Sequence, residues 1–130
     1  IRIAGGTTTY RNNMIALGAG VSNAIGSTAS NSGTTGIVGI NEALGTNNIW
    51  HNNIYIGGTA TAGTGASYAF NGVQVTNTRS FRDNLFVNAR TNSGATGKHY
   101  AVKINGTTVN PTGLTINNNI YYAPNTCCVF

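Results

Sequence analysis

The residues of this chain that could carry acid–base chemistry are few and lie far apart in the sequence. Its two carboxylates are Glu42 and Asp83, and its two imidazoles are His51 and His99. Sugar hydrolysis usually needs two carboxylates that flank the scissile bond, and a calcium site needs several oxygen ligands. Two separated acids predict neither arrangement. We therefore expect a protein that is not an enzyme and that holds no metal and no cofactor.

Three of these residues also have a structural interpretation. Asp83 stands where comparable segments carry asparagine, so we interpret it as a bend residue. We place Glu42 in a loop beside Asn41, and His51 at an outward, solvated position. The sequence contains no Gly-x-Ser-x-Gly nucleophile turn and no Gly-Lys-Ser or Gly-Lys-Thr phosphate loop.

An internal repeat indicates which elements position these residues. Four segments share the order apolar, polar, Asn or Asp, Asn, apolar, apolar: residues 10–15 (YRNNMI), 50–55 (WHNNIY), 81–86 (FRDNLF) and 116–121 (INNNIY). A looser second motif follows three of them, at residues 36–41, 67–72 and 99–106. The stretches 18–35, 57–66 and 91–97 vary in length and are rich in Gly, Ser and Thr, which indicates loops.

Each unit of the repeat predicts a short strand, a tight bend and a second short strand. The apolar stretches are too short for helices and contain β-branched and aromatic residues. Asparagine favours a sharp bend because it tolerates the left-handed backbone region. If such units stack about 4.8 Å apart, each amide side chain can hydrogen-bond to the ones above and below. The predicted ladder consists of Asn13, Asn53, Asn84 and Asn119. A β-sandwich or jelly roll with turns at similar intervals is the alternative.

The segments NIWHNNIY (residues 48–55) and LTINNNIY (residues 114–121) resemble the repeats of right-handed parallel β-helix proteins. They look most like repeats of large secreted or surface-attached bacterial proteins, and the resemblance is clearest over residues 46–126. It implies an all-β, right-handed parallel β-helix (a β-solenoid) of about four rungs without obvious caps. This would be a single domain, or a segment of a longer solenoid, over residues 1–130, with an extracellular or cell-surface location. The family includes pectin-type lyases and hydrolases, phage tailspikes and adhesins, so it implies no single activity.

The repeat also predicts two columns of side chains. One column would form a basic stripe suited to an acidic polysaccharide, and its members are Arg11, His51 and Arg82. The other would be part of the core or, if it faces outwards, an aromatic strip for sugar rings: Tyr55, Phe86 and Tyr121. Seven Lys and Arg against two acids give a net charge of +5. Nucleic-acid binding usually brings a denser basic cluster, so we do not expect it.

The two ends of the sequence have features of their own. Both are apolar, and we expect either caps outside these residues or self-association of copies through exposed strand edges. Cys127 and Cys128 are interpreted either as small buried hydrophobes or as thiols that bond to another copy. Asn105 begins an Asn-Gly-Thr glycosylation acceptor. No stretch reaches the roughly 18 to 20 apolar residues of a membrane span, so no membrane insertion is expected.

These features predict three functions in order of preference. The first is a non-catalytic extracellular structural protein that stacks end to end into a fibre or forms the stalk of a surface protein. Charged residues make up only 7% of the chain, and an uncharged polar surface suits a tightly packed assembly. The second is a polysaccharide-binding, adhesin-like module. The third is a fragment of a pectin-lyase-like carbohydrate-active enzyme whose catalytic acids lie elsewhere.

Overall fold

The computed structural model describes residues 1–18, 37–106 and 111–125, and every regular element in these ranges is a β-strand. The strands are β1 (Arg2–Arg11), β2 (Met14–Leu17), β3 (Ile37–Trp50), β4 (Asn53–Ile56), β5 (Thr59–Ala60), β6 (Ser67–Gly72), β7 (Arg79–Arg82), β8 (Leu85–Asn88), β9 (Thr91–Asn92), β10 (His99–Ile104), β11 (Leu114–Asn117) and β12 (Ile120–Tyr122).

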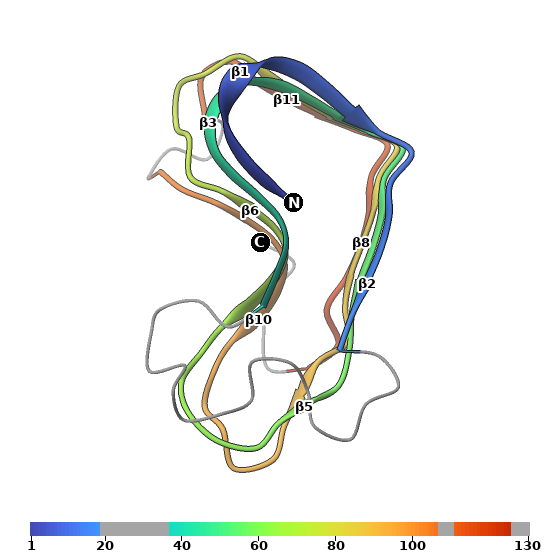
Figure 1. Ribbon diagram of the computed structural model, residues 1–130, viewed down its shortest axis with the longest axis vertical. Coiled ribbons are helices and arrows are strands. Elements are labelled where there is room, and N and C mark those ends of the chain that lie inside the picture. The colour runs from blue at the N-terminus through green and yellow to red at the C-terminus, as the bar shows by residue number, and fades with distance from the viewer. Residues whose placement is uncertain (19–36, 107–110, 126–130) are drawn as a thin grey trace.

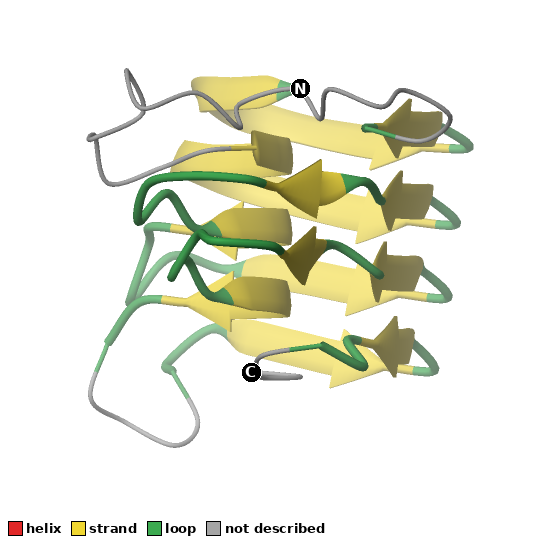
Figure 2. Ribbon diagram, turned by 90° about the horizontal axis from the view of Figure 1, so that it is seen from below, coloured by secondary structure: helices red, strands yellow, loops and turns green. Residues whose placement is uncertain are grey.

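These strands lie in four stacked layers that follow the same path (Figures 1 and 2). Layer 1 holds β1 and β2, layer 2 holds β3 to β5, layer 3 holds β6 to β9, and layer 4 holds β10 to β12. A strand pairs in parallel with the strand at the same position of the next layer, as in the series β2, β4, β8, β12. The predicted all-β class, with parallel strands, is confirmed.

The layers form three curled sheets. The largest has the order β10-β6-β3-β7-β11, with β1 also paired to β3; the second has the order β12-β8-β4-β2, and the third pairs β5 with β9. Strand β3 is 14 residues long and pairs with β6 along its first part and with β7 along its second. In layer 3 this path is divided between β6 and β7, so the largest sheet bends around the interior (Figure 1).

The interior is filled by apolar side chains that alternate with outward-facing ones. Along β4, for example, Ile54 and Ile56 are buried whereas Asn53 and Tyr55 are exposed, which is the two-residue period of a strand. The core also contains a cluster of three phenylalanines. The ring of Phe70 lies 4.6 Å from that of Phe81 and 5.6 Å from that of Phe86, in tilted arrangements that aromatic pairs favour.

One residue makes the bend between the first and second sheets in every layer. It has a positive φ of 58°, 53°, 55° or 51°, and the four residues are Asn12, His51, Asp83 and Asn118. Asn, Asp and His are the side chains enriched in this left-handed region. The value at Asp83 agrees with its interpretation as a bend residue. In layer 2 the predicted alignment was wrong by one position. His51 was aligned with Arg11 and Arg82, which precede the bend, but it makes the bend itself.

The structure also differs from the expected loops. Glu42 was expected in a loop, but it lies in β3 and is fully buried. The stretches 57–66 and 91–97 each contain a short strand, β5 and β9. Apart from Gly18, the stretch 18–35 lies outside the described residues. Within the described ranges, no helix has the length and hydropathy needed to cross a membrane.

Candidate functional site

A ladder of asparagine side chains runs through all four layers just after the bend. The side-chain NH2 groups of Asn13, Asn52 and Asn84 each donate to Oδ1 of the next ladder residue, over 2.8, 3.0 and 2.7 Å. Their backbone N–H groups donate to the same oxygens. The last member, Asn119, accepts both bonds from Asn84. Each layer therefore satisfies polar groups of its neighbour that would be costly to bury alone.

The prediction of Asn53 as a ladder member was wrong, and Asn52 holds that place. Asn52 is fully buried, and its NH2 group also donates to the carbonyl of Tyr10 in layer 1. Asn53 follows it, is exposed, and begins β4. The error came from aligning the adjacent asparagines of layer 2 with residues 12 and 13. The enrichment of histidine in the left-handed region is the signal that could have given the correct register.

The predicted basic stripe is also shifted by one position in layer 2. Strand pairing places one residue of each layer in register on the face next to the bend: Arg11, Trp50, Arg82 and Asn117. The Arg82 guanidinium lies 5.0 Å from the centroid of the Trp50 ring, a cation–π contact, and the Trp50 indole N–H donates to the Ser80 hydroxyl over 3.2 Å. We call the first three members the Arg–Trp column. The sequence did not single out Trp50, because its register was misaligned.

His51 lies at the bend beside this column. Its Nε2 is 3.8 Å from a carboxylate oxygen of Asp83, and the two side chains are 57% and 32% exposed. The other described ion pair joins Glu42 to Arg79. Both acids of the chain therefore already face a basic side chain, and neither faces Arg11 or Arg82.

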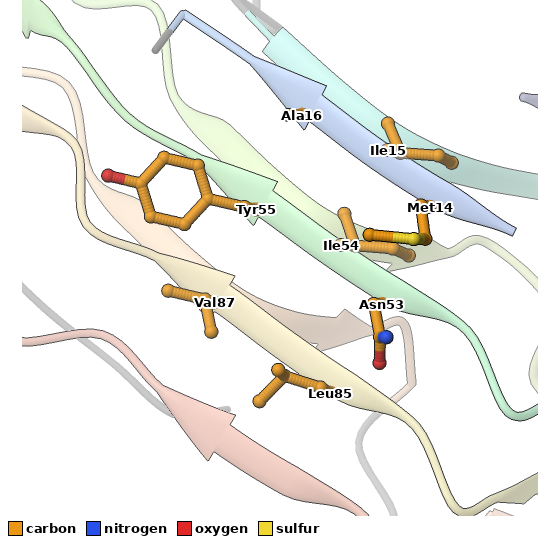
Figure 3. A pocket seen from close by; sticks show the side chains of 8 residues that line it. All are labelled: Met14, Ile15, Ala16, Asn53, Ile54, Tyr55, Leu85 and Val87. Carbon is orange, nitrogen blue, oxygen red and sulfur yellow. The ribbon is translucent and has the colours of Figure 1, made fainter.

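The outer face of the second sheet carries a shallow apolar groove of about 190 Å³. Figure 3 shows its lining side chains on β2, β4 and β8: Met14, Ile15, Ala16, Asn53, Ile54, Tyr55, Leu85 and Val87. The polar groups of these side chains are the Asn53 amide and the Tyr55 hydroxyl. The groove therefore offers apolar contact and little hydrogen bonding.

The predicted aromatic strip is divided between the two faces of this sheet. Strand pairing puts Tyr55 in register with Val87, and Phe86 in register with Ile54 and Tyr121. Phe86 is fully buried and stacks on Tyr121 with ring centroids 6.0 Å apart, whereas Tyr55 faces outwards and is 41% exposed. A single strip of Tyr55, Phe86 and Tyr121 was therefore wrong; the latter two belong to the core, where burial raises the pKa of Tyr121.

An ion pair is fully buried in the interior. A guanidinium nitrogen of Arg79 lies 3.1 Å from a carboxylate oxygen of Glu42, and Asn47 donates to the other carboxylate oxygen over 3.0 Å. Arg79 also donates from Nε to the carbonyl of Asn77. Among the described residues, Arg79 Nη2 and Asn47 Oδ1 are buried without a hydrogen-bond partner. Glu42 therefore lies in the interior, and its carboxylate is not on a surface that a substrate could reach.

A second buried polar group surrounds His99. Its Nδ1 lies 2.8 Å from the Ser67 hydroxyl and its Nε2 lies 2.9 Å from Oδ1 of Asn92. Asn88 donates to the same hydroxyl over 2.9 Å. Burial, and secondarily the nearby Arg90 charge, lower the pKa of His99 to about 4. One consistent arrangement has Ser67 donating to a neutral imidazole that in turn donates to Asn92. A serine hydroxyl hydrogen-bonded to an imidazole is also the arrangement of a nucleophile and its general base. Ser67 and His99 are both buried, however, so here the hydrogen bond stabilises the interior.

Three remaining predictions concern modification and metal binding. Asn105 is half-buried, but Thr107 of its acceptor sequence lies outside the described residues. Cys127 and Cys128 also lie outside them. Within the described part of the chain, no three His, Cys, Asp or Glu side chains are grouped closely enough to hold a metal ion.

Comparison of the chain with protein-family models, with curated proteins and with solved structures gave no match.

Proposed function

We propose that this chain is a segment of right-handed parallel β-helix that serves outside the cell as a non-catalytic structural scaffold. The observation that carries the proposal is the asparagine ladder, which links all four layers through bonds of 2.7 to 3.0 Å between side chains. A right-handed coil is supported by the strong preference of parallel crossover connections for that hand. The location follows from the resemblance to secreted and surface-attached β-helix repeats.

The positions of the reactive side chains favour a scaffold over an enzyme. Glu42 is bound inside by Arg79 and Asn47, and His99 is bound inside by Ser67 and Asn92. Asp83 makes the bend and faces His51. A glycosidase needs two carboxylates that meet its substrate, and here one of the two is enclosed by the core. These groups stabilise the layers and leave little for acid–base chemistry at the surface.

The location can be tested with an antibody raised against the purified chain. Intact cells of the source organism and permeabilised cells would be labelled and counted by immunogold microscopy. We expect equal labelling of the two samples, or labelling of shed material in the medium. Labelling only after permeabilisation would overturn the extracellular scaffold. An experimental structure with a left-handed coil would overturn the β-helix assignment separately.

A second candidate function is binding of a carboxylated polysaccharide along the Arg–Trp column. Arg11 and Arg82 are exposed, and the Trp50 ring lies between them in the register of the strands. Among the described residues, neither Arg11 nor Arg82 forms an ion pair, because Glu42 pairs with Arg79 and Asp83 lies against His51. Guanidinium groups bind carboxylates with two hydrogen bonds, and an aromatic ring between them suits a sugar face.

Calorimetric titration with polygalacturonate, and with neutral dextran as a control ligand, tests this second function. We expect Arg82→Ala and Trp50→Ala each to weaken binding about tenfold, the loss of one desolvated contact. Lys98→Ala removes the same charge from an exposed residue outside the column and is the matched control. Equal weakening by Arg82→Ala and Lys98→Ala, with no effect of Trp50→Ala, would indicate only non-specific attraction by the net positive charge, and the column would not be a site.

A further inference from the structure

The two open edges of the asparagine ladder present opposite hydrogen-bonding groups. In layers 1 to 3 the ladder residue donates its N–H and its NH2 group to the following layer. In layers 2 to 4 the Oδ1 atom accepts from the preceding layer. Among the described residues no layer follows Asn119 and none precedes Asn13, so one edge has the Asn119 N–H and the other has the Asn13 Oδ1. The Asn119 NH2 group already donates to the Phe81 carbonyl and hydrogen-bonds to the Tyr121 side chain. The backbone N–H of Asn119 is therefore the principal donor at this edge.

Apolar side chains at the same two edges are uncovered. Met14 in layer 1 and Ile120 in layer 4 are 86% and 65% exposed, the largest exposures among the described large apolar residues. They stand at opposite ends of one column of the second sheet. Ile116 is in register with Phe81, which is 1% exposed, but is itself 39% exposed because no described layer covers it. Among the described residues, the core therefore has no cover at the layer 4 edge.

We propose that a second copy of this chain covers this edge, with its layer 1 placed on layer 4 of the first copy in the register that the layers already use. The Asn119 N–H of one copy then donates to Oδ1 of Asn13 in the next. The NH2 group of that Asn13 donates to the carbonyl of Ile116, as Asn52, Asn84 and Asn119 donate to Tyr10, Ile49 and Phe81. The inference rests on the scaffold function and names the partner and the register. Such a joint is head to tail, so it leaves the same edges free and builds a filament.

The side chains that this register brings together are compatible. Ile120 meets Met14, Tyr122 meets Ala16, and Ile116 meets Tyr10, all of them apolar or aromatic pairs, by extension of the observed strand pairing. In the Arg–Trp column, Asn117 meets Arg11, so no like charges are opposed there. A register shifted by one residue would instead turn every core side chain to the wrong face.

One column opposes the joint. Arg2 pairs with Asn41, Asn41 with Asn71, and Asn71 with Lys103, so stacking would place Lys103 of one copy over Arg2 of the next. The net charge of +5 adds a general repulsion between copies. Arg2 is exposed and Lys103 is half-buried, so their repulsion acts near the solvent and is screened by salt, as is the general repulsion. Assembly is therefore expected to need, and to increase with, added salt.

The test uses the whole purified chain in sedimentation velocity and negative-stain microscopy, over a concentration series at low and at moderate salt. We expect unbranched filaments above a threshold concentration that falls as salt is added. Met14→Lys and Ile120→Asp should each raise this threshold about tenfold, because a charge then faces an apolar side chain across the joint. The double variant Met14→Lys/Ile120→Asp should return it to within about threefold of the parent, since opposite charges then meet.

Asn53→Lys and Asn53→Asp are the matched controls, because Asn53 is exposed in the same column but belongs to layer 2. They change the net charge in the same way, so they measure the general repulsion alone and should move the threshold by less than about twofold. A monomeric chain at every concentration and salt would overturn the joint. So would filaments that the two single variants do not weaken, or assembly that stops at symmetric dimers. The cell-labelling experiment is independent of all three results, so the joint can fail while the scaffold function stands.

Discussion

Two of the polar systems that are buried in this fold are built differently. The ladder at the bend uses neutral amides, and the same residue type recurs in every layer. The interior pair of Glu42 and Arg79 uses opposite charges and occurs once. In the ladder each amide is both donor and acceptor, so adding a layer adds a bond of the same kind. In the pair each charge has a single partner of opposite charge.

This difference predicts where the fold is most sensitive. Removing a ladder side chain leaves neutral groups unpaired in two adjacent layers. Removing one member of the ion pair leaves a charge without its partner in a core that contains Phe70 and Phe81. Charges are much costlier to bury alone than amides. The four predictions below test this ranking, from the largest expected effect to the smallest.

Arg79→Met should have the largest effect, a loss of about 3 to 5 kcal/mol in the free energy of unfolding, because Glu42 is then buried without its cation. Urea denaturation followed by circular dichroism measures this loss. The double variant Glu42→Gln/Arg79→Met removes both charges and should recover at least half of it. If Arg79→Met alone cost less than about 1 kcal/mol, the ion pair would not be the more sensitive of the two systems.

Asn84→Ala should follow, with a loss of about 3 kcal/mol, since it removes the Oδ1 acceptor shared by the Asn52 N–H and NH2 groups and the donor to the Ile49 carbonyl. Asn53→Ala makes the same chemical change one layer away at an exposed position, and should stay within about 0.5 kcal/mol. The same denaturation experiment compares them. Equal losses in the two variants would contradict the register of the ladder.

Acid should destabilise the protein through His99. Burial, with a smaller contribution from Arg90, lowers the pKa of His99 from 6.5 to about 4, so the folded imidazole stays neutral while the unfolded one takes up a proton. Stability from this group is therefore complete above pH 6.5 and falls as the pH drops towards 4. Between pH 6.5 and 5 the loss is about 2 kcal/mol.

Thermal melts at a series of pH values measure this dependence. His99→Gln should flatten the profile over that range, whereas His51→Asn should leave its slope unchanged because the His51 side chain lies largely in solvent. A profile of wild-type slope in His99→Gln would show that another group is responsible.

His51→Asn should have the smallest effect on stability, within about 0.5 kcal/mol at neutral pH. Asparagine occupies the same bend position in layers 1 and 4 and adopts the left-handed backbone region as readily as histidine does. The exchange also removes the 3.8 Å contact of His51 with Asp83, which is an ion pair only when the imidazole is protonated and which contributes little at the surface. A loss above about 1.5 kcal/mol, measured by denaturation, would mean that His51 does more than form the bend.

Much of the fold could be predicted from the repeat, and the errors of register have one origin. The all-β class, the parallel stacking, the bend at Asp83 and three of the four ladder residues agree with the structure. The register errors all lie in layer 2, where Asn53, His51 and Tyr55 were each aligned one position away from their neighbours in space. Because strand side chains alternate with a period of two, a shift of one residue exchanges inside and outside. The interior partners of Glu42 and His99 carry no repeating signal and could not be predicted.

The sequence by itself therefore determined the kind of structure: short strands, a sharp Asn-type bend and amides that recur at similar intervals. These are local properties, set by side-chain shape, backbone preference and alternation. Only the tertiary structure decided which residue of layer 2 makes the bend, that Glu42 meets Arg79 across 37 residues, and that Ser67 meets His99 across 32. Such contacts depend on how many residues each layer uses to complete its path, and that number varies from layer to layer.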